Sequence, residues 1–335
     1  MTAQNVIEMR KVTKIFGEFV ANDQIDLQVR KGEIHALLGE NGAGKSTLMN
    51  MLSGLLEPTS GEIIVNGETK KIDSPSKASK LGIGMVHQHF MLVDAFTVTE
   101  NIILGNETVH GGKLDIKKAE KEILELSQKY GLEVKPDALV RDINVGQQQR
   151  VEILKTLYRG ANILIFDEPT AVLTPAEILE LLDIMRNLVK EGKSIILITH
   201  KLEEIRAVAD RVTVIRCGKS IETAEAEGRS SKEQAEMMVG HSVSFVTEKK
   251  AANPGKVVLD IKDLVVHESR GAQAVKSLSL QVHAGEIVGV AGIDGNGQSE
   301  LVRAITGLQH VESGQVNVKG QNVANYRPRQ ITEMS

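Results

Sequence analysis

A chain of 335 residues is too long for one ordinary hydrophobic core, and its length predicts about two domains. With 41% apolar and 25% charged residues, the composition excludes extensive disorder. The net charge of -4 excludes the general basic surplus of nucleic-acid-binding proteins, so no nucleic-acid partner is expected.

The cysteine content and the hydropathy pattern argue against a disulfide-stabilised, secreted or membrane-spanning protein. The single cysteine, Cys217, cannot form an intrachain disulfide. No apolar run reaches the ~18–20 residues that span a bilayer, and the N-terminus lacks the basic start and apolar core of a signal peptide. If the protein works at a membrane, we expect it to act from the aqueous side through a partner.

The first strongly patterned segment predicts a strand, a glycine-rich loop and a helix. IHALL (34–38) is a short apolar run of the buried-strand type, and STLMNMLSGLL (46–56) has helical character. Between them, GENGAGKS (39–46) matches the pattern G-x-x-x-x-G-K-[ST] of phosphate-binding loops. A glycine-rich turn with an incidental lysine is the alternative, but the flanking strand and helix favour a nucleotide site.

The chemistry of this loop explains its residue types. Glycines let the backbone turn tightly, so that successive N–H groups and the following helix N-terminus point at phosphate oxygens. Lys45 would reach the β- and γ-phosphates, Ser46 would bind Mg²⁺, and Thr47 would support the α-phosphate side. The predicted contacts within the loop are Asn41, Gly42, Gly44, Lys45, Ser46 and Thr47.

Two further buried-type strands end in polar residues that suit phosphoryl transfer. ILIFDEPT (163–170) ends in an acid pair, in which Asp167 can hold Mg²⁺ through water and Glu168 can orient and polarise an attacking water. IILITH (195–200) ends in His200, which could bridge the γ-phosphate and that water. An acidic turn and a solvated histidine are the alternatives.

A helix is expected between these two strands. AEILELLDIMRNLVKE (176–191) has apolar residues at helical spacing. Thr174 and Pro175 suit its N-cap and first turn, and Gly192 suits its end. Strands that alternate with helices predict an α/β fold with a parallel-sheet core.

The same pattern occurs twice in the chain. Residues 32–67 and 285–320 align without a gap, and five glycines of the first stretch recur 253 positions later. Two related units are therefore expected, because a repeat of this length indicates duplicated domains. TEKKAANPGK (247–256) has the composition of a linker. The second unit begins near Val257, is much shorter than the first, and looks cut off.

The order of motifs resembles that of an ABC (ATP-binding-cassette) ATPase. The phosphate loop is followed by Gln88, VGQQQR (145–150), the acid pair and His200. The resemblance implies that ATP lies between the phosphate loop of one cassette and the signature motif of another. It also implies that Gln88 reaches Mg²⁺ and touches a transmembrane partner, that Phe16 stacks on adenine, and that AVLTPAE (171–177) contacts the opposite cassette.

This resemblance completes the predicted organisation. Residues 1–246 would form the first ABC cassette, with a helical subdomain at roughly 88–155, and residues 257–335 would form the N-terminal part of a second, degenerate cassette. The cofactors would be ATP and Mg²⁺. The predicted catalytic residues are Lys45, Glu168 and His200, and the predicted metal ligands are Ser46, Gln88 and Asp167.

Two departures from the family pattern are expected to weaken one ATP site. The signature reads INVGQ (143–147) rather than LSGGQ, and Val145 adds bulk where a glycine backbone would approach phosphate. In the second phosphate loop, Gln298 replaces the lysine and removes a positive charge. The position 253 residues after Phe16 is Ser269, so no adenine platform is expected there. The residues concerned are Asn144, Val145, Gly146 and Gln147 in the signature, and Gly292, Asp294, Gly297, Gln298 and Ser299 in the second loop.

Head-to-tail pairing of the two cassettes would place both departures in one degenerate site. The other site would combine Lys45, Glu168 and His200 with a signature motif from the second cassette, which this chain does not include. We therefore expect the chain by itself to bind ATP but to hydrolyse it poorly.

Three stretches narrow the resemblance to the tandem-cassette subunits of bacterial simple-sugar and nucleoside importers, most similar to the nucleoside branch: 87–105, 151–177 and 291–301. This implies transmembrane permease subunits and, indirectly, an extracytoplasmic solute-binding protein as partners, with the chain peripheral at the cytoplasmic face of the membrane. A simple sugar such as ribose or galactose is the alternative cargo. A soluble tandem-cassette ATPase that acts on ribosomes is disfavoured by the short linker, and a small-molecule P-loop kinase by the repeat.

Overall fold

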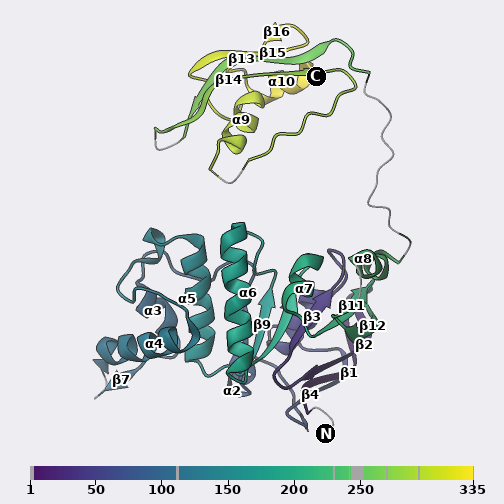
Figure 1. Ribbon diagram of the computed structural model, residues 1–335, viewed down its shortest axis with the longest axis vertical. Coiled ribbons are helices and arrows are strands. Elements are labelled where there is room, and N and C mark those ends of the chain that lie inside the picture. The colour runs from purple at the N-terminus through teal and green to yellow at the C-terminus, as the bar shows by residue number, and fades with distance from the viewer. Residues whose placement is uncertain are drawn as a thin grey trace. The chain divides into compact units, whose positions relative to one another are not determined.

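The computed structural model describes residues 4–110, 113–228, 231–240, 242, 253–268, 271–292 and 295–334. The chain divides into two compact units, Met1–Ser244 (unit 1) and Phe245–Ser335 (unit 2), both drawn in Figure 1. None of the described helices combines the length and the apolar character that crossing a bilayer requires.

The larger sheet of unit 1 has six strands in the order β12-β11-β3-β10-β9-β6. Neighbouring strands from β11 to β6 run parallel, and β12 at one edge is antiparallel. Every residue of β3, β9 and β10 is buried, which agrees with their apolar sequences. The predicted α/β fold with a parallel core is confirmed. The strands are β3 (Ile34–Leu38), β6 (Ile83–Val86), β9 (Ile163–Asp167), β10 (Ser194–Ile198), β11 (Arg211–Arg216) and β12 (Lys219–Glu225).

Unit 1 has a second, antiparallel sheet with the strand order β2-β1-β4-β5. The sequence patterns do not predict this sheet. Helix α1 packs against both sheets, because Leu48 of α1 shares one hydrophobic core with Met9 of β1 and Ile196 of β10. This packing fixes the position of the loop that precedes α1. The elements are β1 (Asn5–Phe16), β2 (Phe19–Arg30), β4 (Ser60–Val65), β5 (Glu68–Thr69) and α1 (Lys45–Leu52).

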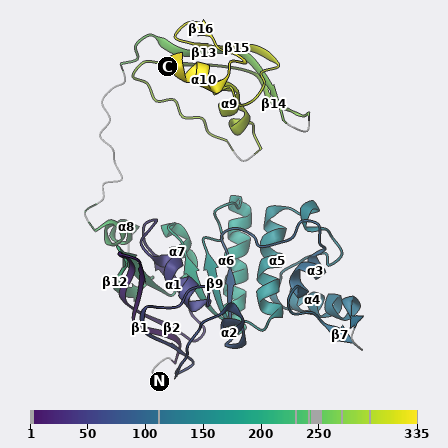
Figure 2. The ribbon, with the colours of Figure 1, turned by 180° about the vertical axis from the view of Figure 1, so that it is seen from behind.

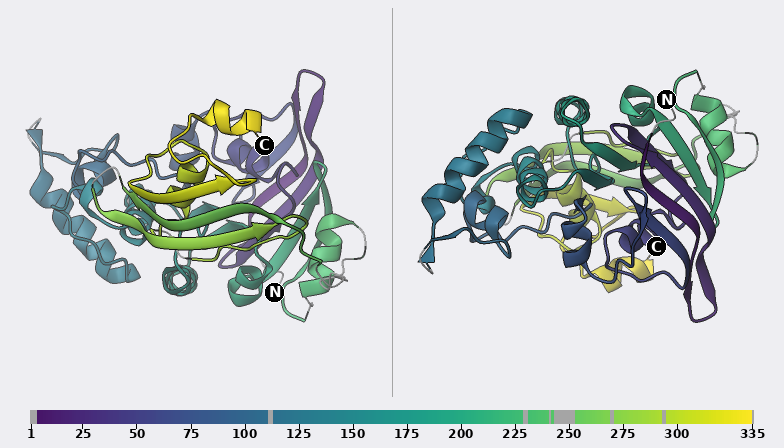
Figure 3. Two further views of the ribbon diagram at one scale, coloured as in Figure 1. Left: turned by 90° about the horizontal axis from the view of Figure 1, so that it is seen from above. Right: turned by 90° about the horizontal axis from the view of Figure 1, so that it is seen from below.

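A group of helices, α3 to α5, extends unit 1 beyond the main sheet. They share a second hydrophobic core with α6, β9 and β10, to which Ile102, Ile123, Leu154 and Leu181 contribute. Figure 1, Figure 2 and the two further views of Figure 3 all place these helices at one end of unit 1 and the β1–β2 hairpin at the other. The remaining elements of unit 1 are α2 (Pro75–Lys80), α3 (Val98–Ile103), β7 (Val109–His110), β8 (Lys113–Leu114), α4 (Ile116–Tyr130), a 3-10 turn (Val140–Asp142), α5 (Val145–Tyr158), α6 (Pro175–Lys190), α7 (Leu202–Val208) and α8 (Ser231–Val239).

Helix α6 begins at the residue that the sequence indicates. Thr174 is its N-cap, and the Thr174 Oγ1 atom accepts a hydrogen bond from the backbone N–H of Glu177 at 3.4 Å. In return, the Glu177 carboxylate accepts a hydrogen bond from the backbone N–H of Thr174 at 2.9 Å. This reciprocal capping box fixes the point at which the chain that leaves β9 enters α6.

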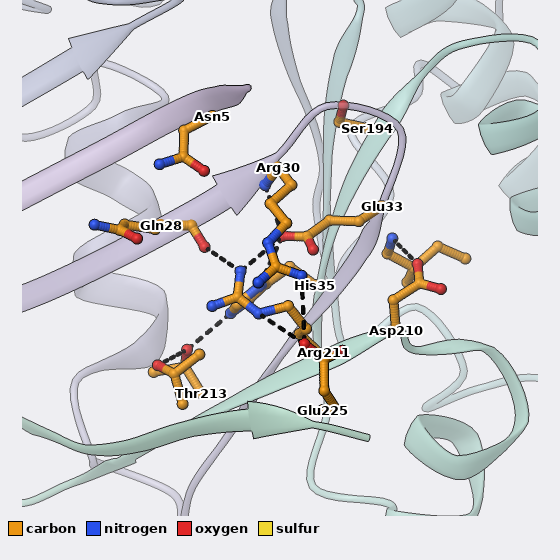
Figure 4. A network of polar contacts seen from close by, with 12 residues as sticks. Asn5, Gln28, Arg30, Glu33, His35, Ser194, Asp210, Arg211, Thr213 and Glu225 are labelled. Carbon is orange, nitrogen blue, oxygen red and sulfur yellow. Dashed lines mark hydrogen bonds and ion pairs between the residues drawn. The ribbon is translucent and has the colours of Figure 1, made fainter. Parts of the chain in front are cut away.

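A buried polar network joins the two sheets of unit 1 near the start of β3 (Figure 4). The ring of His35 is fully buried, with Nδ1 3.1 Å from Glu33 Oε1 and Nε2 2.8 Å from Thr213 Oγ1. Arg211 reaches Glu33 Oε1 at 3.4 Å and the carbonyl of Gln28 in β2 at 3.3 Å. Burial lowers the pKa of His35, and the hydrogen bond to Glu33 opposes this change. The network therefore ties β3 to β2 and β11.

Unit 2 repeats the antiparallel sheet of unit 1, with the strand order β14-β13-β15-β16. The repeat extends to unusual backbone angles, because Gln24 and Ser277 have φ values of 48° and 54°, and Asn66 and Lys319 have values of 51° and 50°. Each of these pairs is separated by the 253 positions seen in the sequence. The elements are β13 (Val257–His267), β14 (Gln273–His283), α9 (Gln298–Ile305), β15 (Ser313–Val318), β16 (Gln321–Asn322) and α10 (Pro328–Met334).

The counterpart of β3 in unit 2 does not form a strand. The segment IVGVA (287–291) aligns with IHALL of β3 but has no strand pairing, and Ile287 is 90% exposed. In unit 1, β3 takes its hydrogen bonds from β10 and β11. Among the described residues of unit 2, no strand corresponds to either neighbour, so the apolar run lacks the partners that a parallel strand needs.

Candidate functional site

The first phosphate loop connects the end of β3 to the start of α1. Gly42 and Gly44 have φ values of 81° and 101°, which strain any residue with a Cβ. A Cβ on Gly39 would lie 2.2 Å from the backbone oxygen of Ile215, and one on Gly44 would lie 2.6 Å from that of Ala21. Close packing thus requires a glycine at position 39, the backbone angle requires one at position 42, and both reasons apply to Gly44. Gly44 is the N-cap of α1, so the loop feeds directly into the amino end of a helix.

Lys45 is the first residue of α1, one position earlier than the sequence suggests. Its side chain is buried and folds back over the loop, where Nζ donates to the carbonyls of Gly39 at 2.7 Å and Glu40 at 2.9 Å. Burial lowers the pKa of Lys45, while the negative charges of Glu168 and Asp167 oppose this effect. The ammonium group is therefore held inside the loop at the place where phosphate oxygens would bind.

The acid pair lies at the carboxyl end of β9, next to the same loop. Ser46 Oγ and Asp167 Oδ1 are 3.5 Å apart. Asp167 is buried, and burial raises its pKa, while the hydrogen bond from Ser46 lowers it and the charge of Glu168 raises it further. The hydroxyl group of Ser46 and the desolvated carboxylate of Asp167 thus lie next to each other at the start of α1.

Glu168 is held by two of the predicted site residues. Gln88 Nε2 donates to Glu168 Oε2 at 3.2 Å, and His200 Nδ1 lies 3.2 Å from Glu168 Oε1. β9 and β10 are adjacent parallel strands, so their carboxyl ends bring Glu168 and His200 together, and the backbone N–H of Glu168 donates to Ile198 of β10 at 3.0 Å. Glu168 has a φ of 46°, a strained angle that is common at functional sites. The structure gathers Lys45, Ser46, Asp167, Glu168, Gln88 and His200 at one edge of the sheet.

The remaining residues predicted to bind ATP lie around this edge and on the β1–β2 hairpin. Asn41 is exposed in the loop, and Thr47 is half-buried in the first turn of α1. Phe16 ends β1 with 45% of its surface exposed, and its ring centroid lies 5.1 Å from Lys14 Nζ. That ammonium group also donates to the carbonyl of Glu57 at 2.7 Å. The aromatic ring is therefore available to a planar ligand and is braced by a cation.

The signature residues form the start of α5. Asn144 is the N-cap: its Oδ1 accepts from the backbone N–H of Gln147 at 2.8 Å, and Gln147 Oε1 accepts from the backbone N–H of Asn144 at 3.1 Å. Val145 is 38% exposed, and a Cβ on Gly146 would lie 2.6 Å from Glu177 Oε1. Among the described contacts, no hydrogen bond or ion pair joins these four residues to the acid pair.

The described part of the second loop resembles the first loop and carries a different side chain. Gly297 has a φ of 88° and is the N-cap of α9, as Gly44 is of α1. Gln298 Nε2 lies 1.9 Å from the point where a Cβ on Gly292 would stand, so its amide folds over the loop as the ammonium of Lys45 does. Ser299 is exposed, and the predicted residue Asp294 lies outside the described residues.

The counterpart of Phe16 is Glu268, which corrects the expectation of Ser269. The N–H of Thr59 donates to the carbonyl of Thr13, and the N–H of Glu312 donates to that of Val265. Because Thr59 and Glu312 are 253 positions apart but Thr13 and Val265 are 252 apart, the first strand of unit 2 is shifted by one residue. Ser269 itself lies outside the described residues, and Glu268 lines a cavity of about 490 Å³ beside the second loop, together with Lys276 and Gln298.

One buried charged pair near the site was not anticipated. Glu152 and Lys155 of α5 both contact the backbone of Met91, three residues after Gln88. The N–H of Met91 donates to Glu152 Oε1 at 2.6 Å, and Lys155 Nζ donates to the carbonyl of Met91 at 2.8 Å. The signal available in the sequence was an acid and a base three residues apart in an otherwise apolar part of α5. The pair attaches the segment after Gln88 to the helix that begins with the signature.

Comparison with known proteins identifies relatives over the whole chain. The nucleoside import ATP-binding protein NupA of Lactococcus lactis subsp. cremoris is 71% identical over 335 residues, which are 100% of this chain and 66% of NupA. The guanosine import ATP-binding protein NupO of Bacillus subtilis is 62% identical over 98% of this chain and 64% of NupO. The ribose import ATP-binding protein RbsA 3 of Rubrobacter xylanophilus is 42% identical over 98% of this chain and 65% of its own length. The chain spans about two thirds of the length of these relatives.

Solved structures agree with the fold. The structure of cbiO1 from Clostridium perfringens, part of the ABC transporter complex cbiONQ, is 27% identical with a TM-score of 0.61, and covers 71% of this chain and 95% of that chain. A nucleotide-free ATP-binding cassette of an ABC transporter, 22% identical with a TM-score of 0.60, covers 70% of this chain and 95% of that chain and shows the shared fold. The family described as "ABC transporter" matches residues 22–171 and 275–334, more than half of the sequence in total. With its phosphate loop, acid pair and glutamine at one edge of a parallel sheet, the chain belongs to the ABC transporter family.

Proposed function

We propose that the chain is the ATP-hydrolysing part of an ABC importer whose cargo is a nucleoside. The observation that carries the proposal is the position of Glu168, held between Gln88 and His200 at the sheet edge that also bears Lys45. This arrangement suits the activation of a water molecule next to a bound triphosphate. The similarity to nucleoside and guanosine import proteins supports the cargo.

The residues predicted to hold Mg²⁺ fit that ion. Ser46, Asp167 and Gln88 offer hydroxyl, carboxylate and amide oxygens, which are the hard donors that Mg²⁺ prefers, and the oxygens of Ser46 and Asp167 are close enough for one small ion. Among the described residues, no group of three or more His, Cys, Asp or Glu could hold a metal by itself, so ATP oxygens would complete the shell. When bound, Mg²⁺ would neutralise charge that develops on the phosphates.

In the proposed reaction, a water oxygen forms a bond to the γ-phosphorus while the bond from that phosphorus to the β–γ bridging oxygen breaks, which yields ADP and phosphate. Glu168 orients the water and accepts its proton. His200 holds the Glu168 carboxylate and contacts the γ-phosphate. Lys45 exchanges the carbonyls of Gly39 and Glu40 for β- and γ-phosphate oxygens, and Phe16 stacks on the adenine.

The proposal extends to the organisation of two ATP sites. Residues 1–246 act as the first cassette, residues 247–256 as a linker, and residues 257–335 as the start of a second, degenerate cassette. The first signature, with Asn144 and Val145, and the second loop, with Gln298, both depart from the family pattern, and each would weaken the ATP site to which it contributes. The family match in residues 275–334 supports the second cassette.

The partners proposed are permease subunits in the membrane, reached from its cytoplasmic face, and indirectly an extracytoplasmic solute-binding protein. The segment after Gln88 supports a permease contact, because Met91, Val93 and Phe96 are 62%, 39% and 37% exposed. Several exposed apolar side chains within one short segment are consistent with an interaction site. Motion of Gln88 on ATP binding would then pass directly to the permease.

Uptake measurements test the function and the cargo together. Cells would carry the complete protein with Lys45→Ala, or with Lys31→Ala as a matched control, since Lys31 is exposed and precedes β3, whereas the loop follows that strand. We expect Lys45→Ala to abolish uptake of labelled purine nucleosides and to leave ribose and galactose uptake unchanged. Loss of sugar uptake alone would move the cargo to a simple sugar. If neither uptake changed, the importer proposal would be wrong.

A further inference from the structure

One buried carboxylate, that of Glu204, has no role in the mechanism described above. Glu204 lies in α7 and is only 4% exposed. Its Oε2 atom accepts a hydrogen bond from Thr199 Oγ1 at 2.8 Å, and its Oε1 atom accepts one from Thr170 Oγ1. Placing a carboxylate away from water costs free energy unless it is paired, so these contacts need an explanation.

Lys201 completes the set of partners. Its Nζ atom lies 3.4 Å from Glu204 Oε1 and donates to both the hydroxyl of Thr170 at 3.0 Å and the carbonyl of Thr170 at 3.2 Å. The backbone N–H of Lys201 donates to Thr199 Oγ1 at 3.0 Å. Four side chains thus form a closed network in which the buried charge is balanced by a cation and by two hydroxyl groups.

The two threonines belong to the two chain segments that carry the predicted catalytic residues. Thr170 is two residues after Glu168 at the end of β9, and Thr199 directly precedes His200 at the end of β10. Glu204 therefore joins the two segments through Thr170 and Thr199, and the contact between Glu168 Oε1 and His200 Nδ1 joins them a second time at 3.2 Å. The backbone of Glu168 has a left-handed φ of 46°, a strained angle that persists only where surrounding contacts hold it.

We propose that Glu204 is a positioning residue that fixes the separation of Glu168 and His200 by accepting hydrogen bonds from Thr170 and Thr199. The proposal rests on the proposed ATP hydrolysis at this site. Glu204 makes no contact with ATP in this proposal and acts through the two threonines. Misplacing a reacting group by about 1 Å can reduce a rate about a hundredfold, so a carboxylate that sets this distance matters for turnover.

A purely structural role for Glu204 predicts a different outcome from a positioning role. If Glu204 only docked α7, its loss would lower the free energy of unfolding, and the rate would fall in proportion to the fraction of protein that still binds ATP, so kcat per ATP-binding site would stay unchanged. If it positions the pair, the phosphate loop remains intact, so binding is preserved and only turnover falls. The neighbouring Glu203 is exposed in the same helix turn and serves as the matched control.

The test uses the complete transporter, with Glu204→Gln and Glu203→Gln compared with the unaltered protein. We expect Glu204→Gln to reduce kcat for ATP hydrolysis about ten- to a hundredfold, with KM for ATP within about twofold. Glu203→Gln should change neither. The isosteric variants Thr170→Val and Thr199→Val should each reduce kcat partly, and Glu204→Asp should restore part of the rate. A kcat for Glu204→Gln within about twofold of the control would overturn the proposal, as would a loss of rate that matches the loss of ATP-binding sites counted by titration.

Two further readouts keep the outcome decisive. If Glu204→Gln does not fold, Thr199→Val carries the same test, because it removes one of the two bridging hydroxyls and keeps the side-chain volume. If the unaltered transporter hydrolyses no ATP, the proposed function fails, and positioning is then judged by NMR of ¹⁵N-histidine-labelled protein. In that experiment Glu204→Gln should shift the Nδ1 resonance of His200 and Glu203→Gln should not. An unchanged resonance would refute the positioning role on its own.

Discussion

The Nζ atom of Lys45 lies 2.7 Å from the carbonyl oxygen of Gly39, so the loop already holds its own lysine before any phosphate arrives. The second loop reproduces this fold-back, with the amide of Gln298 packed against Gly292. Both side chains can bridge the loop, but only an ammonium group carries the charge that phosphate oxygens need. The side chains that fold over the two loops therefore differ in charge.

A change of Lys45 to glutamine should convert the first loop into the second type. We expect Lys45→Gln to fold normally, because the amide can donate to the same carbonyls and the cost of burying a cation is removed. Affinity for ATP should fall about a hundredfold, since a charge-assisted contact to phosphate is lost. Titration with a fluorescent ATP analogue measures this, with Lys31→Gln as the control. Unchanged affinity would show that Lys45 does not reach the phosphates.

Asp167→Asn should separate stability from function. Burial raises the pKa of Asp167, so the folded state favours the protonated form, and this stabilising contribution is lost as pH rises through the folded pKa. At pH 7 the asparagine variant should therefore gain about 1 kcal/mol in the free energy of unfolding in urea, while the Mg²⁺-dependent part of ATP binding disappears. Asp183→Asn, at an exposed position of α6, provides the comparison. A less stable Asn variant at pH 7 would contradict the role of burial.

The buried His35 predicts a loss of stability in mild acid. Because burial lowers its folded pKa, the unfolded chain binds a proton below about pH 6.5 that the folded chain does not bind. The free energy of unfolding should thus fall by up to about 1.4 kcal/mol per pH unit below that value, until the folded pKa is reached. His35→Gln should remove this part of the slope between pH 7.5 and 5.5 in urea titrations. His89→Gln, at an exposed position, should leave the slope in place; equal slopes for all three proteins would exclude His35 as the source.

Asn144 should matter first as a helix cap. Asn144→Ala removes the hydrogen bond to the N–H of Gln147 and should destabilise unit 1 by about 1 kcal/mol in thermal unfolding. Asn144→Ser keeps a capping oxygen and should stay within a few tenths of a kcal/mol of the original. The same alanine change at the exposed Asn106 serves as the control. If alanine and serine behave alike at position 144, the cap contributes nothing to stability.

Much of the central architecture could be predicted from local sequence. The apolar runs at 34–38, 163–166 and 195–199 became the buried strands β3, β9 and β10, and the Thr174–Pro175 pair marked the start of α6. These signals are local, because burial on both faces of a parallel strand requires continuous apolar residues. The phosphate loop could be predicted equally well, because glycines occur where the backbone adopts angles that other residues avoid.

What the sequence could not supply depends on contacts between distant segments. The one-residue shift that makes Glu268 the counterpart of Phe16 follows from strand pairing, which a gap-free alignment of the loops does not reveal. The exposed segment at 287–291 is apolar enough for a strand but lacks neighbours among the described residues. Glu204 and Glu152 look like ordinary helix surface residues in the sequence, and only the fold shows what they bind.

The hydrogen bonds that Glu152 and Lys155 make with Met91 involve only its main-chain N–H and carbonyl groups. Met91 itself is 62% exposed. Any residue except proline has the same N–H and carbonyl groups for these hydrogen bonds. The side chain at position 91 can therefore change during evolution without loss of the hydrogen bonds that attach this segment to α5. The attachment of this segment to α5 and the side chain that it presents at the surface can thus diversify independently.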